Sequence, residues 1–185
     1  MIKEFLDDGE EQMKKAITSL KSDLRTIRTG RANPALLDRI MVSYYGVPTP
    51  IKQVATISAP EGRLLMIKPW DKGAIKGIER AILESNLGLN PNNDGKVIRL
   101  VLPQLTQQRR QQLVKQVGKR AEEARVSIRN TRRDVIKDLK DAQKEGMITE
   151  DDLYRAQDKV KGLTNKYIQK VDDALKDKED EIMEI

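Results

Sequence analysis

Apolar residues recur at helical spacing in three long stretches of the chain. The first covers residues 5–27, the second Leu113–Ala142 and the third Leu153–Ile182. In the second stretch the positions advance by three or four residues at a time, 29 residues in eight steps, which is close to the period of an α-helix. The stripe therefore stays on one face, and the pattern predicts three amphipathic helices.

The ends of the second and third helices carry typical start and stop residues. Thr149 can cap the third helix, and the carboxylates of residues 150–152 in its first turn favour the helix dipole. Gly146 stands where a left-handed residue would end the second helix. Thr106 can cap its start, although Gln107-Gln108 provides no acidic partner for a capping box. We therefore expect one continuous helix from about Thr106 to Gly146.

The segment between the first two helices has a different pattern. The β-rich residues 40–45 are followed by Gly46, Pro48 and Pro50, as in strands that are broken by turns. The further elements predicted are a strand at Leu64–Lys68 after a turn at 60–62, a short helix at Ala74–Ser85, a loop at Asn90–Gly95 and a strand at Val97–Leu102.

These elements predict an α+β fold that is mainly helical and has two domains. Residues 1–29 and 106–185 would form a long three-helix bundle, and residues 30–105 a small inserted α/β domain, rich in strands and with one helix. The chain would cross between the domains at 29–31 and at 103–106, and two neighbouring crossings form a natural hinge. The candidate hinge residues are Gly30, Pro103, Gln104 and Leu105.

The composition excludes several classes of enzyme. The 185 residues include no Cys and no His, which removes zinc sites and Ser-His or Cys-His hydrolase sites. No glycine-rich loop ends in Gly-Lys-Ser or Gly-Lys-Thr. A carboxylate-only metal site stays open, although a helix N-terminus explains residues 150–152 better. We predict a protein that is not an enzyme and has no catalytic residues, no metal and no cofactor.

The N-terminus and the hydropathy bear on location. No run of about 18 apolar residues is present to span a bilayer. The acidic pair Asp7-Asp8 replaces the apolar core of a signal peptide. We therefore expect a cytoplasmic protein with no membrane partner.

Basic residues are concentrated in the second helix. Residues 105–146 contain 12 Lys and Arg against six Asp and Glu, whereas residues 147–185 contain seven against 11. Such an asymmetry points to a polyanionic partner for the basic segment.

Four arginines, Arg125, Arg129, Arg132 and Arg133, form what we call the arginine stripe. The first three lie at i, i+4 and i+7 on one face, and only Arg125 has an acidic residue, Glu122, three or four positions away. Neighbouring like charges cost about 0.2–0.5 kcal/mol per pair, so helix stability alone does not favour the pattern. Guanidinium groups suit bidentate phosphate contact, and we interpret the stripe as an RNA-binding surface. The alternative is pairing with the acidic third helix across the bundle.

Other residues are weaker candidates for RNA contact. Arg28 and Arg31 bracket the hinge glycine, although cations at a helix C-terminus are an equal explanation. Arg109 and Arg110 lie near a helix N-terminus, where cations oppose the dipole.

The aromatic residues allow a second kind of RNA contact. Trp70 and the pair Tyr44-Tyr45 could stack on bases. With so few aromatics in a small domain, we favour core or interface packing for them.

Several motifs in fixed order resemble the ribosome recycling factor family. They are Arg28–Asp38 (RTGRANPALLD), Tyr44–Gly46 (YYG), Leu87–Pro91 (LGLNP), Leu105–Arg110 (LTQQRR) and Ala124-Arg125 with Arg129–Asp134 (RNTRRD). The resemblance runs essentially from end to end and includes the length. One departure is Gln107-Gln108, because family members usually have an acidic residue after the threonine.

The resemblance implies an L-shaped, tRNA-like protein that binds large-subunit ribosomal RNA in the post-termination ribosome. With elongation factor G, which hydrolyses GTP, such a protein splits the ribosome into subunits with release of mRNA and tRNA. It implies that Arg129, Arg132 and Arg133 bind ribosomal RNA. It also implies that the small domain swings about Gly30 and residues 103–105 and meets the elongation factor.

The alternative function is that of a helical structural or adaptor protein without RNA binding. Assembly with other helices requires a spare apolar face, and the second helix has no apolar seam beyond the one described. We therefore expect a monomer. Binding to RNA phosphates predicts an affinity that falls steeply with salt, which separates the two functions.

Overall fold

The structure is a computed structural model that describes residues 1–184, and it contains two compact units. The helical unit consists of Met1–Leu24 and the chain from Gln111 onward, and the inserted unit is Arg25–Arg110. The prediction of a mainly helical α+β fold with an inserted domain is confirmed. The divisions lie five residues before and five residues after the predicted crossings.

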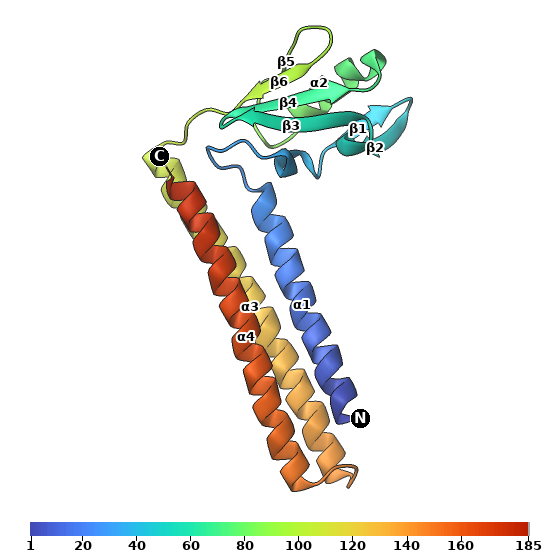
Figure 1. The fold of residues 1–185 in the computed structure, drawn as a ribbon, viewed down its shortest axis with the longest axis vertical. Helices are drawn as coiled ribbons and strands as arrows, with labels where there is room; N and C mark the ends of the chain where they lie inside the picture. The colour runs from blue at the N-terminus through green and yellow to red at the C-terminus, as the bar shows by residue number, and fades with distance from the viewer. Residues whose placement is uncertain (185) are drawn as a thin grey trace. The chain divides into compact units, whose positions relative to one another are not determined.

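Three long helices form the helical unit. They are α1 (Ile2–Thr26), α3 (Gln107–Lys144) and α4 (Glu150–Met183), and they lie side by side as a bundle (Figure 1). Every position of the predicted seam in α3, from Leu113 to Ala142, is buried. The 3.6-residue period therefore identified the packed face correctly.

The ends of α3 and α4 agree with their predicted markers. The Thr149 hydroxyl accepts a hydrogen bond from the Asp152 N–H at 3.1 Å, and the Asp152 carboxylate accepts one from the Thr149 N–H at 3.2 Å. These bonds form a capping box and hold the pKa of Asp152 below its ordinary value. Thr106 caps α3 by accepting from the Arg109 N–H at 3.1 Å. Gly146 follows α3 with a φ of 74°, a left-handed conformation that glycine adopts without strain.

Polar contacts connect each pair of helices in the bundle. Arg120 of α3 pairs with Asp23 of α1. The Tyr167 hydroxyl of α4 donates to Glu10 of α1 at 3.1 Å, and its pKa is raised by burial and by that carboxylate. Arg125 of α3 pairs with Asp172 of α4 at 2.7 Å, so that all three interfaces have a fixed register.

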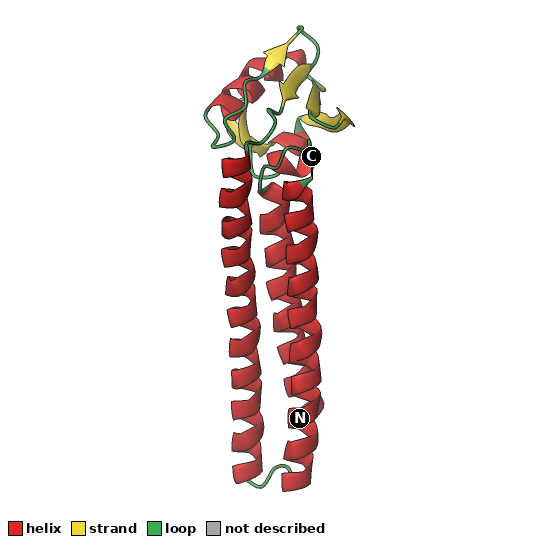
Figure 2. Ribbon diagram, turned by 90° about the vertical axis from the view of Figure 1, so that its left-hand side faces the viewer, coloured by secondary structure: helices red, strands yellow, loops and turns green. Residues whose placement is uncertain are grey.

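The inserted unit contains two antiparallel sheets and one helix of more than one turn. β1 (Met41–Tyr44) pairs with β2 (Val47–Pro50), and the second sheet has the order β3-β4-β6-β5. The bounds of the remaining elements are β3 (Ala55–Glu61), β4 (Leu64–Pro69), α2 (Ile75–Leu83), β5 (Asn92–Asn93) and β6 (Ile98–Val101), with short 3-10 helices at Pro34–Leu37, Ile51–Gln53 and Lys72–Ala74. Figure 2 shows the strands gathered in this unit. The core that they enclose is aliphatic, with Leu65, Ile67, Ile78 and Leu100 fully buried.

The sequence prediction missed three strands, and each lies at an edge. Pro48 and Pro50 were interpreted as breaks, yet they lie in β2, which pairs on one side only and so does not need their missing N–H groups. β3 includes Pro60, which was assigned to a turn, and β3 is also an edge strand with a register shift between Ser58 and Glu61. β5 falls within the predicted loop at Asn90–Gly95.

Both segments that lead into the strands of the inserted unit are hydrogen-bonded to the β3–β4 turn. The Ala32 N–H donates to the Gly62 carbonyl at 2.7 Å, and the Leu102 N–H donates to the Arg63 carbonyl at 2.8 Å. Gly30 lies close to Leu105, since a Cβ added to Gly30 would be 3.9 Å from the Cγ of Leu105. The two connecting segments therefore start beside each other at the β3–β4 turn.

Candidate nucleic-acid interface

Arg125, the first residue of the arginine stripe, is held by two carboxylates. Its Nε and Nη2 donate to Asp172 Oδ1 at 3.0 and 2.7 Å, and its Nη1 donates to Glu122 at 3.1 Å. The side chain is only 19% exposed, and the Asp172 carboxylate raises the pKa of the guanidinium further. Arg125 therefore follows the alternative interpretation of the stripe, in which an arginine pairs with an acidic residue of α4 across the bundle.

Arg129 also has a partner within α3. Its Nη1 donates at 3.0 Å to Glu122, two helical turns earlier, and the hydrogen bonds from Arg129 and Arg125 hold the pKa of Glu122 below its ordinary value. Sequence spacing of three or four residues does not indicate this pair, because the long arginine side chain reaches a carboxylate seven positions away. Glu122 is exposed, so a phosphate can replace it as the partner of Arg129.

Arg132 and Arg133 complete the stripe and differ from the first two arginines. Within residues 1–184, neither side chain has an ion pair or a hydrogen bond. Arg132 is half-buried and Arg133 is exposed. Unpaired guanidinium groups at a helix surface are free to contact phosphate oxygens without first losing another partner.

Both arginines line a groove of about 1020 Å³ between α3 and α4, which we call the basic groove. The other cations along it are Lys137, Lys140, Lys144 and Lys161. Sequence reasoning missed these lysines as site residues. The signal for three of them was present, because Arg133, Lys137, Lys140 and Lys144 continue the helical spacing of the stripe. Lys161 lies on α4, and no pattern within α3 could have found it.

The remaining candidate arginines lie at the junction of the two units in the sequence. Arg28 is half-buried, and Arg31 and Arg109 are exposed. Arg110 is only 8% exposed, because it continues the seam of α3 three positions before Leu113. Its burial argues against direct phosphate contact.

The aromatic residues of the inserted unit are more exposed than expected. Trp70 is 68% and Tyr45 is 81% exposed, so of the core or interface packing that we favour, core packing is wrong for both, and interface packing stays a prediction. Tyr44 packs partly against the core. Both tyrosine hydroxyls donate to Asp71 Oδ2, at 3.2 and 2.9 Å. The hydrogen bond from the Gly73 N–H, together with those from the two tyrosines, lowers the pKa of Asp71.

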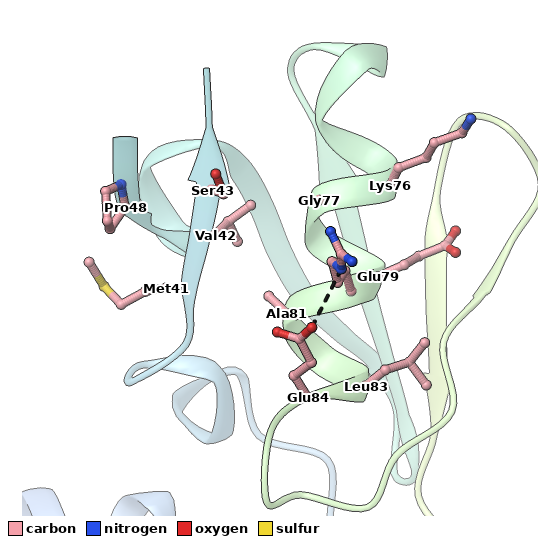
Figure 3. Close-up of a pocket in the computed structure, with 11 residues that line it drawn as sticks. Met41, Val42, Ser43, Pro48, Lys76, Gly77, Glu79, Ala81, Leu83 and Glu84 are labelled. Carbon is pink, nitrogen blue, oxygen red and sulfur yellow. Dashed lines mark ion pairs between the residues drawn. The ribbon is translucent and has the colours of Figure 1, made fainter. Parts of the chain in front are cut away.

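A second groove, of about 760 Å³, lies between β1 and α2 (Figure 3). Figure 3 shows Val42 pointing from β1 toward α2, where Gly77 allows a close approach, since a Cβ there would lie 3.2 Å from the Ser43 carbonyl oxygen. An ion pair between Arg80 and Glu84, at 3.4 Å, lies at the rim. The lining holds no cluster of unpaired cations, so it is not a phosphate site.

Comparison with known proteins gives the family. The model of the family "Ribosome recycling factor" matches residues 20–183. The chain belongs to the ribosome recycling factor family. Ribosome-recycling factors from Syntrophomonas wolfei and Halalkalibacterium halodurans are each 56% identical over 185 residues, which cover the whole of both chains.

Two solved structures of ribosome recycling factors are also similar. A solution structure has a TM-score of 0.82 and 41% identity and covers 100% of this chain and 98% of its own. The second describes the T. thermophilus ribosome recycling factor and E. coli elongation factor G on the E. coli post-termination complex. Its TM-score is 0.71, with 43% identity and 99% coverage of both chains. In the described part of the chain, no helix has the length and apolar character to cross a membrane.

Proposed function

We propose that this chain is a translation factor that recycles ribosomes. It binds the post-termination ribosome and, with elongation factor G and GTP, promotes its disassembly into subunits with release of mRNA and tRNA. Full-length identity of 56% to ribosome-recycling factors is the observation that carries this proposal. The chain acts by binding and movement in the cytoplasm, and the GTPase partner carries out the hydrolysis. It is a translation factor and not an enzyme.

Arg132 and Arg133, with Arg129 beside them, form the central contact with ribosomal RNA. Two observations support this: within residues 1–184 neither Arg132 nor Arg133 has an ion pair or a hydrogen bond, and Glu122, the partner of Arg129, is exposed. Arg28, Arg31 and Arg109 contribute less. We assign Arg125 to packing against α4. We do not include Arg110 in the RNA-binding surface, because its side chain is buried.

The connecting segments form the hinge about which the inserted unit moves to meet elongation factor G. Ala32 and Leu102 are held by hydrogen bonds to the β3–β4 turn, so we place the rotation just outside these two residues, at Gly30 and at Pro103, Gln104 and Leu105. Movement of a unit about two neighbouring crossings requires few dihedral changes.

The test is polysome breakdown with elongation factor G and GTP, together with affinity for ribosomes. Loss of one charged hydrogen bond is worth about 1.5–3 kcal/mol, so Arg132→Ala should weaken ribosome binding by roughly 10- to 100-fold. Lys115→Ala, which removes an exposed cation elsewhere on α3, is the matched control and should behave as wild type. Full activity of Arg132→Ala would contradict the role of this arginine. Absence of any breakdown by the wild-type chain would contradict the function.

A further inference from the structure

The basic groove concentrates cations that have no partner within the described residues 1–184. Six cations line it, namely Arg132, Arg133, Lys137, Lys140, Lys144 and Lys161, against two acids, Asp141 and Asp158. Within residues 1–184, none of the six side chains has an ion pair or a hydrogen bond. Their mutual repulsion does not help the bundle to fold, and their concentration attracts a ligand with negative charge.

The row of cations on α3 is long enough to face several phosphates of a nucleic-acid backbone. Arg133, Lys137, Lys140 and Lys144 share one face of α3 and extend over 11 residues, or about 16 Å at the rise of an α-helix. One nucleic-acid strand in a helix presents a phosphate about every 3.4 Å, so this row faces about five phosphates. Lys161 approaches from α4 and supplies the opposite wall.

Tyr154 adds an exposed ring at the end of the basic groove nearest the α3–α4 turn. The side chain is 59% exposed, and its hydroxyl donates to Glu150 at 3.2 Å, which limits the orientations of the ring. An aromatic ring among cations is the arrangement that binds unpaired nucleotides, because the base stacks on the ring while the phosphate contacts the cations. A base within a regular duplex is already stacked on both faces, so it has no free face on which the tyrosine ring can stack.

We propose that the basic groove binds an RNA segment with an unpaired nucleotide, whose base stacks on Tyr154 and whose neighbouring phosphates contact the lysines of α3 and Lys161 of α4. This inference rests on the proposed function and specifies the RNA that the site takes. An acidic protein segment would also be attracted by the charge. However, protein–protein interfaces are depleted of lysine at their cores, and four of the six cations are lysines.

The first test compares two double variants on the same helix. Lys140→Gln/Lys144→Gln removes two groove charges, and Lys115→Gln/Lys119→Gln removes two exposed charges at the same spacing outside the groove. The affinity for purified large ribosomal subunits is measured across a series of KCl concentrations. The groove variant should make the slope of log K against log[KCl] shallower by about two, and the control should leave it unchanged. Equal slopes for the two double variants would overturn the proposal.

The second test isolates the ring. Tyr154→Ser should weaken binding to the subunits by about 5- to 100-fold without changing the salt slope, because stacking carries no charge. Tyr154→Phe keeps the ring and should bind as the wild type does. Equal affinity of the Ser and Phe variants would overturn the role of Tyr154. Thermal unfolding of each variant checks that the bundle is intact, and an exposed helical position such as this one tolerates all three residues.

The third test identifies the class of ligand and separates the two proposals. A photoreactive benzoylphenylalanine at position 154 should cross-link to ribosomal RNA, and cross-linking only to a ribosomal protein would overturn the inference. If Arg132→Ala loses affinity while the Lys140→Gln/Lys144→Gln and Tyr154→Ser variants bind normally, the inference fails and the proposed function stands. If Arg132→Ala also binds normally, the RNA-binding surface of the proposed function fails as well.

Discussion

Gly9 sets how closely α1 can approach α3. A Cβ added to this buried glycine would lie 2.6 Å from Cγ2 of Val135, well inside van der Waals contact. Val135 is β-branched and has one strongly preferred rotamer in a helix, so it does not turn away easily. Overpacking of this kind costs about 1–3 kcal/mol, whereas Gly→Ala in a helix gains only about 1 kcal/mol of helix propensity. Gly9→Ala should therefore destabilise the bundle by up to about 2 kcal/mol.

Gly118 in α3 and Gly162 in α4 are matched controls. Both lie inside long helices, and a Cβ at either would meet no heavy atom within 4 Å. Gly118→Ala and Gly162→Ala should thus each stabilise the protein by about 0.5–1 kcal/mol. Both substitutions add the same helix propensity, so subtracting the change in unfolding free energy of a control from that of Gly9→Ala leaves the steric cost at Gly9.

Thermal unfolding followed by helical ellipticity measures this difference. For a chain of this length, 1 kcal/mol corresponds to roughly 2–4 °C in Tm, so Gly9→Ala should melt about 2–12 °C below the control variants. Val135→Ala should reverse the sign of the Gly9→Ala effect in the double variant, because the new methyl group then fills vacated space. A Gly9→Ala protein as stable as the controls would refute the close-approach argument.

Three further predictions concern the packing contact, the helix cap and the hinge. Arg125→Ala should lower stability by about 1–2 kcal/mol through loss of the Asp172 pair and leave ribosome affinity unchanged, and a weaker affinity at unchanged Tm would contradict its assignment. The pKa of Asp152 lies below its ordinary 3.8 in the folded state, so the stabilisation over Asp152→Asn should be fully present well above pH 3.8 and be lost as the pH falls below 3.8, through the lowered pKa of the folded state. A Tm difference that persisted at low pH would exclude the charge as its source. A disulfide between Gly30→Cys and Leu105→Cys, in a chain with no other cysteine, should slow polysome breakdown until it is reduced, and undiminished activity in the oxidised form would argue against the hinge.

The bundle was predictable because its packing signal is long and regular. Each seam residue of α3 from Leu113 to Ala142 is buried, since a helix with one face in water must repeat its apolar positions every 3.6 residues. The caps at Thr106 and Thr149 depend on single side chains and their neighbours, and they too could be read locally. The strands β2 and β3 could not, because an edge strand pairs on one side only and tolerates the prolines that normally indicate a turn.

The candidate site was predictable only along a single helix. Spacing placed the arginines of α3 on one face, but it did not show that Glu122 reaches Arg129 or that Arg125 is occupied by Asp172 from α4. The basic groove needs Tyr154 and Lys161, which come from the next helix. Their distance from α3 depends on how the two antiparallel helices pack against each other. The spacing of residues within either helix does not give that information.

The anchoring of Ala32 and Leu102 to one turn also has an evolutionary consequence. A segment whose two ends leave from the same place can be inserted into a host protein with little loss of chain entropy in the host. The same arrangement makes the segment transplantable, because a short loop can replace it without separating the helices it interrupts. Residues 32–102 could therefore be exchanged between relatives as one module, which would let this segment change its partner preference while the arginine stripe and the basic groove of the helical unit stay unchanged.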